Sequence, residues 1–96
     1  MTFDVTQELK NRFNKMKIDE KMPDNIAIKS VDSDNEGKIE LIISMDPETC
    51  KNWSGIMIND LKLEDSGYNM NFDYSHEREE LVFTYTAPGW IEFSGH

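Results

Sequence analysis

The sequence predicts an α+β fold, an antiparallel β-meander of about 4–6 strands with an N-terminal helix and a second short helix packed on one face. Three observations predict it. Apolar residues repeat at helical spacing near the N-terminus, a helix-start signal occurs in mid-chain, and apolar and polar residues alternate in the last third. A sheet with both helices on one face would bury both apolar helix stripes. The length of 96 residues predicts a single domain over 1–96, and no internal repeat is evident.

The N-terminal helix is predicted over residues 4–17. Its apolar positions fall on one face of a helix, at Val5, Leu9, Phe13 and Met16. Strands are predicted next at 25–31 and 38–45, joined by the turn-forming residues of 32–37. The first half of the chain is therefore expected to form a helix followed by a hairpin.

The second helix is predicted to begin at Asp46, an N-cap residue, with Pro47 in the first helical position. Cys50, Trp53 and Met57 continue at helical spacing. Gly55 weakens the pattern, and the alternative is a helix that stops near residue 54 before a strand from residue 56. We favour a helix of two to three turns.

The last third of the chain predicts strands at 68–74 and 80–86, because apolar residues there alternate with polar ones. A short strand is expected around Leu61 and Leu63. A final short strand is expected to contain Trp90, Ile91 and Phe93.

Motifs for catalysis or for metal binding are incomplete. Residues 32–39 match the first eight positions of a calcium loop, but its twelfth position would be Ile43 where a glutamate is needed. The segment from His76 lacks the second histidine of a zinc-protease helix, and the lone Cys50 is expected on the apolar face of its helix. The sequence therefore predicts no catalytic residue, no metal, no cofactor and no enzymatic activity.

The charge is the most unusual bulk property, since nineteen acidic and ten basic residues give a net charge of −9. Such a surface repels nucleic-acid phosphates and acidic membranes and suits a basic protein surface. We therefore expect a protein partner and no direct binding to nucleic acid or membrane; the oligomeric state stays open. The single cysteine and the absence of a signal-peptide pattern favour a cytoplasmic setting.

The function expected from these features is that of a non-enzymatic accessory protein, inhibitor or assembly factor that docks on a basic partner through an acidic surface. The abundance of Asn, Asp, Ile, Lys and Met is typical of many bacteriophages, so a phage protein acting in the host cytoplasm is part of this hypothesis. Two alternatives remain open: a nucleic-acid mimic that inhibits a DNA- or RNA-handling protein, and a small enzyme or ligand-binding protein with a concave pocket.

The candidate partner-binding residues are acids of the predicted loops together with a tryptophan, a residue type enriched at binding hot spots. We expect the acids to converge in a single rim along one edge of the sheet. The candidates are Asp32, Asp34, Glu36, Glu64, Asp65, Glu77, Glu79, Glu80 and Trp90.

Overall fold

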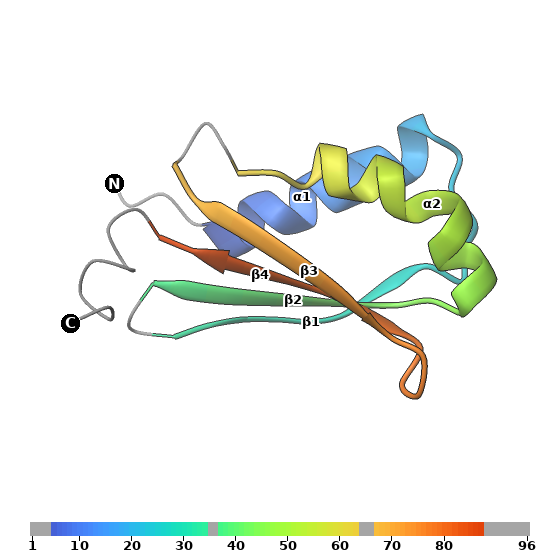
Figure 1. Ribbon diagram of the computed structural model, residues 1–96. Helices are drawn as coiled ribbons and strands as arrows, with labels where there is room; N and C mark the ends of the chain where they lie inside the picture. Colours follow the sequence, from blue (N-terminus) through green and yellow to red (C-terminus); the bar gives the residue numbers. More distant parts are fainter. Residues whose placement is uncertain (1–4, 35–36, 64–66, 88–96) are drawn as a thin grey trace.

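The computed structural model describes residues 5–34, 37–63 and 67–87. Within them, two helices lie over one face of a four-stranded antiparallel sheet with the strand order β1-β2-β4-β3 (Figure 1). The predicted α+β class, sheet type and two helices are confirmed. The elements are α1 (Val5–Asp19), β1 (Ala27–Ser33), β2 (Lys38–Ser44), α2 (Pro47–Asp60), β3 (Asn69–Ser75) and β4 (Glu80–Thr86).

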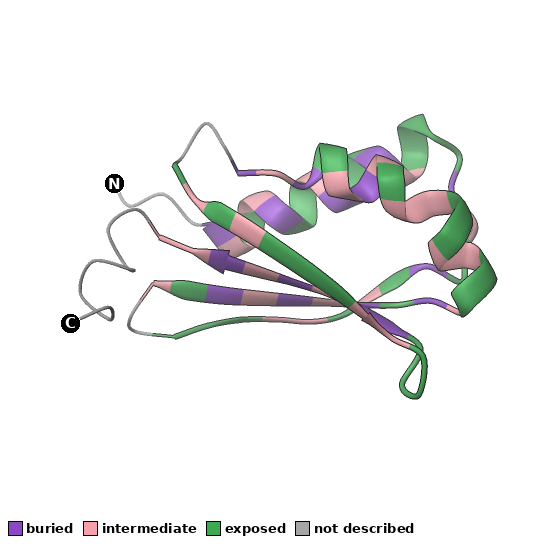
Figure 2. Cartoon of the chain, viewed as in Figure 1, coloured by how far each residue is buried: buried purple, intermediate pink, exposed green. Residues whose placement is uncertain are grey.

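The core lies between the helices and the two central strands. Ile39, Leu41 and Ile43 of β2 stand opposite Tyr85, Phe83 and Leu81 of β4, and all six side chains are buried. The predicted α1 stripe is buried in the same core, and Figure 2 shows buried residues in purple on α1 and on the two central strands. Because side chains alternate along a strand, the residues between these positions lie on the opposite face of the sheet.

The described elements form two successive αββ units. Val5 and Pro47, Ala27 and Asn69, and Lys38 and Glu80 begin matching elements and are each 42 residues apart. The two units join through β2 and β4, and the middle pair of that ladder, Leu41 and Phe83, is also 42 residues apart. The units are therefore related by an approximate twofold axis at the centre of the sheet. Few residues match at this spacing, so the sequence did not indicate the repeat.

Helix α2 begins as predicted and ends later than predicted. The Asp46 side chain accepts a hydrogen bond from the Thr49 N–H at 2.7 Å, and Pro47 is the first helical residue. The helix continues for 14 residues, through exposed Gly55, so the alternative strand from residue 56 is wrong. The strand expected around Leu61 and Leu63 is also wrong, since the backbone N–H of Leu61 closes the helix on the Met57 carbonyl.

The strands match their predicted positions to within two residues at either end. The predicted strand with Trp90, Ile91 and Phe93 lies outside the described residues. Helix α2 connects β2 to β3, and β4 then inserts beside β2, so that β1 and β3 are the outer strands of the described sheet. This order decides which strand edges face outward.

Candidate functional site

The predicted acidic rim is divided between two ends of the sheet. Asp32 and Asp34 lie by the β1–β2 connection, whereas Glu77 and Glu79 lie in the turn between β3 and β4. The β2–β4 register sets these two connections at opposite ends of seven-residue strands, about 20 Å apart. A single rim that contains both pairs is therefore wrong. Glu36, Glu64, Asp65 and Trp90 are outside the described residues.

Contrary to the prediction, Glu80 does not expose its carboxylate to solvent. It is the first residue of β4, it is only 3% exposed, and its carboxylate pairs with the ammonium group of Lys29. Lys29 lies at the irregularity in the β1–β2 register, between Ile28 and Ser30. The contribution predicted for Glu80 as an exposed partner-binding acid is wrong, because this carboxylate ties β1 to β4.

Asp34 serves the hairpin between β1 and β2. Its backbone N–H donates to the Lys38 carbonyl, and its Oδ1 accepts from the Lys38 N–H, each at 2.9 Å. These bonds account for an aspartate at this position without an ion. The residues that the structure describes contain no group of three or more His, Cys, Asp or Glu side chains placed to hold a metal.

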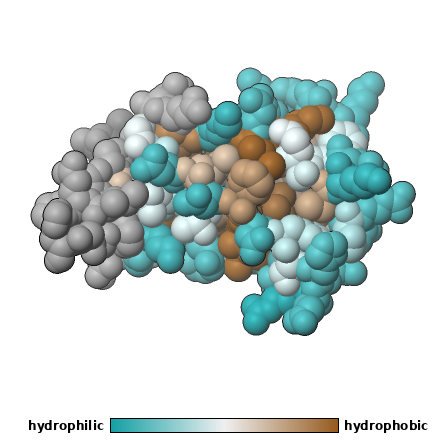
Figure 3. Space-filling view, viewed as in Figure 1, coloured by the Kyte–Doolittle hydropathy of each residue, from teal (hydrophilic) through white to brown (hydrophobic). Residues whose placement is uncertain are grey.

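A groove of about 240 Å³ runs between α2 and β3. We call it the edge groove, because β3 is an outer strand. Phe72 projects on the helix side of β3, opposite Phe83 with ring centroids 6.2 Å apart, yet it remains 51% exposed. Figure 3 shows apolar surface gathered in the middle of this face. The groove is lined by Cys50, Ser54, Ile58, Phe72, Asp73, Tyr74 and Leu81.

Two tyrosines bind backbone carbonyls just outside the two ends of α2, the helix that forms one side of the edge groove. The Tyr74 hydroxyl donates to the Met45 carbonyl just before the helix, and the Tyr85 hydroxyl donates to the Leu61 carbonyl just after it, both at 2.8 Å. Arg12 of α1 also donates to a backbone carbonyl just after α2, at Lys62. Burial raises the pKa of Tyr85, so its hydroxyl stays a neutral donor.

Cys50 is half-buried on the groove wall. Burial raises the pKa of its thiol, and a hydrogen bond with Ser54 opposes this effect. A raised pKa lowers the thiolate fraction and hence the nucleophilicity. Among the described residues that line the groove, none is a histidine that could act as a base beside this thiol.

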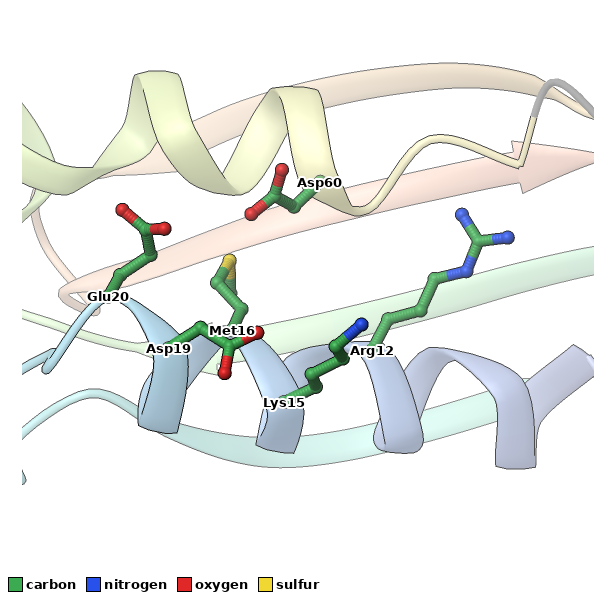
Figure 4. Close-up of a pocket in the computed structure, with 6 residues that line it drawn as sticks. All are labelled: Arg12, Lys15, Met16, Asp19, Glu20 and Asp60. Carbon is green, nitrogen blue, oxygen red and sulfur yellow. The ribbon is translucent and has the colours of Figure 1, made fainter.

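A second hollow, of about 370 Å³, lies between α1 and the end of α2 (Figure 4). Its wall carries both signs of charge, and Arg12 already bonds Glu8 at 2.7 Å as well as the Lys62 carbonyl. The lining residues contain no nucleophile with a base beside it and give no specific reaction. They are Arg12, Lys15, Met16, Asp19, Glu20 and Asp60.

The sequence did not bring out an acidic end of the molecule, which only the fold assembles. The end of α1 with the following connection, the start of α2 and the β3–β4 turn lie at the same end of the described structure, on the right in Figure 1. Exposed acids outnumber exposed bases in these segments. The acids are Asp19, Glu20, Asp24, Glu48, Glu77 and Glu79, and the bases are Lys21, Lys51 and Arg78.

Comparisons with known proteins leave this arrangement without a family: no family model, no curated protein and no solved structure matches the chain. Among the described residues, neither helix has the length and apolar character required to cross a membrane.

Proposed function

We propose that this chain is a non-enzymatic protein-interaction module that docks on a basic protein surface, as an accessory protein, inhibitor or assembly factor. One observation carries the proposal: Phe72, half-exposed on an outer strand, stands beside an apolar groove close to the acidic end. Exposed aromatic side chains next to a hollow are typical anchors of protein interfaces. A phage protein that acts on host machinery is the setting that the composition favours.

Charge and apolar surface contribute to different steps of binding, namely association and dissociation. With a net charge of −9, the chain attracts a basic partner over a distance of about one Debye length, about 8–10 Å at physiological salt. Long-range attraction of this kind raises the association rate, while the apolar contact governs dissociation. The acidic end supplies the first contribution and the edge groove the second.

The test compares equal charge removal at the two ends of the sheet. The chain is immobilised, basic proteins of a cell lysate are passed over it, and the association rate of each retained and purified protein is measured. Glu77→Gln combined with Glu79→Gln should slow association by about 3- to 10-fold at low salt. The control, Asp32→Asn with Asp34→Asn, removes the same charge at the opposite end and should slow it by less than about twofold.

Raising the salt to about 0.5 M should remove most of the difference between these variants. An association rate that ignores both salt and the Glu77 and Glu79 changes would contradict docking by charge. Retention of no basic protein would contradict the proposal as a whole.

A further inference from the structure

Within the described residues, β3 lacks three features that commonly prevent strand addition at an outer edge, namely lysine, proline and a bulge. Natural outer strands are blunted by lysine, proline or a bulge. β3 reads NMNFDYS, with neither residue, and its register with β4 is regular throughout. The matching outer strand β1 has both Lys29 and a register irregularity. Of the two outer strands that the structure describes, only β3 is therefore unguarded.

The edge groove lies directly along this unguarded edge. A strand added beside β3 would alternate its side chains between the helix side and the opposite side of the sheet. A residue on the helix side would meet Phe72 and Ile58, whereas its neighbours along the added strand would lie near Asp73. One apolar position flanked by polar positions is thus the pattern that fits.

The charged side chains around the groove determine whether acidic or basic residues would be favoured at the polar positions of an added strand. Asp73 lines the groove, and Glu79 and Asp46 act electrostatically on the Tyr74 hydroxyl at the same end. The described residues that line the groove include no lysine or arginine. An incoming strand with lysine or arginine at alternate positions would therefore be favoured over an acidic one.

We propose that β3 binds an extended segment of a partner protein as a fifth strand, with alternating basic and apolar residues and one apolar side chain in the edge groove beside Phe72. Main-chain hydrogen bonds to β3 would supply affinity, and the groove and Asp73 would supply specificity. This inference rests on the proposed function and specifies the structural mode of docking.

The probe is the capped heptapeptide KVKLKVK, added to the isotope-labelled chain and followed by amide chemical shifts. Shifts should concentrate in β3 and on the groove side of α2. Alternate β3 amides, those not bonded to β4, should exchange more slowly with solvent when the peptide is present. The matched peptide EVELEVE should leave both properties unchanged.

Two exposed apolar residues provide a matched pair of variants. Phe72→Ala should weaken peptide binding by roughly fivefold or more, because it removes the groove contact. Ile18→Ala should change binding by less than about twofold, since Ile18 is 77% exposed on α1, away from β3. Asp73→Lys, which adds a guarding lysine to the edge, should abolish binding.

Three results would overturn this inference. One is an equal effect of Phe72→Ala and Ile18→Ala. A second is slow exchange of the outward β3 amides in the free monomer, since the edge would then already be covered. The third is a dimer in sedimentation that Phe72→Ala dissociates, which would make a second copy the occupant. If a purified partner still binds in a salt-dependent way while Phe72→Ala has no effect on it, the proposed function stands and strand addition at β3 fails.

Discussion

The two αββ units, residues 5–44 and 47–86, have the same order of elements but hold their helices by different means. Helix α1 buries four apolar side chains, at Val5, Leu9, Phe13 and Met16. In α2 only Met57 is buried, and the helix is fastened at its ends by the two tyrosine hydroxyls and Arg12. The other apolar side chains of α2, at Cys50, Trp53, Ile56 and Ile58, pack against the core but are only partly buried. Cys50 and Ile58 are among the residues that form one wall of the edge groove.

The outer strands of the two units, β1 and β3, also differ in how regular and how exposed they are. Val31 of β1 takes the place that Phe72 has in β3, because Val31 stands opposite Leu41 as Phe72 stands opposite Phe83. Val31 is partly buried against the core, whereas Phe72 is 51% exposed. Close to Val31, β1 has the register irregularity at Lys29, which pairs with Glu80. The first unit thus has an irregular outer strand tethered through Lys29, whereas the second has a regular outer strand with an exposed aromatic ring.

The largest expected effect is a difference in stability loss when one phenylalanine of each unit is replaced by alanine. Phe13→Ala should lower the free energy of unfolding by about 3–5 kcal/mol, because the ring is buried in the core. Phe72→Ala should lower it by less than about 1 kcal/mol, since half of its surface is already exposed. Urea denaturation with an unchanged m-value measures both. A loss of similar size at the two positions would make Phe72 a structural residue and remove the contrast between the units.

A smaller effect is expected from the tyrosines that fix α2. Tyr85→Phe leaves the buried Leu61 carbonyl without its donor and should cost about 1–2 kcal/mol. Tyr74→Phe should cost less, because Tyr74 is only half-buried. A variant as stable as the natural chain would show that apolar contacts alone hold α2.

The same tyrosine predicts a pH dependence. The pKa of Tyr85 is raised in the folded state, so its contribution to stability is fully present below the unfolded value of about 10 and is lost as the pH rises above it. Stability should therefore fall from about pH 10 upward, and more steeply in the natural chain than in Tyr85→Phe. Thermal unfolding at pH 8, 10 and 11 compares the two slopes; parallel slopes would contradict a buried neutral hydroxyl.

The smallest expected effect concerns Cys50. Because burial raises the pKa of its thiol, a disulfide reagent at pH 8 should label the native chain about 3- to 10-fold more slowly than the chain in urea. Cys50→Ala should change stability by less than about 1 kcal/mol, since the side chain is only half-buried. Native labelling faster than in urea would instead indicate an activated thiol and a role in chemistry.

The sequence was sufficient where local chemistry decides the structure. The α1 stripe follows from apolar spacing, the start of α2 from Asp46 and Pro47, and β4 from its alternation. The sequence misled where a long-range interaction decided the outcome. Gly55 suggested a helix end, but α2 continues through that position to Asp60, and Ile56, Met57 and Ile58 directly after it pack against the core.

For the candidate site, too, some properties follow from the sequence alone and others only from the tertiary structure. Acidity, the absence of a complete catalytic motif and the positions of most helices and strands were determined by the sequence alone, because they depend on composition and on neighbours along the chain. Only the tertiary structure decided that β4 inserts beside β2, because strand order depends on pairing between residues about 40 positions apart. That insertion separates the two groups of acids, buries Glu80 against Lys29 and leaves β3, with Phe72, as an open edge.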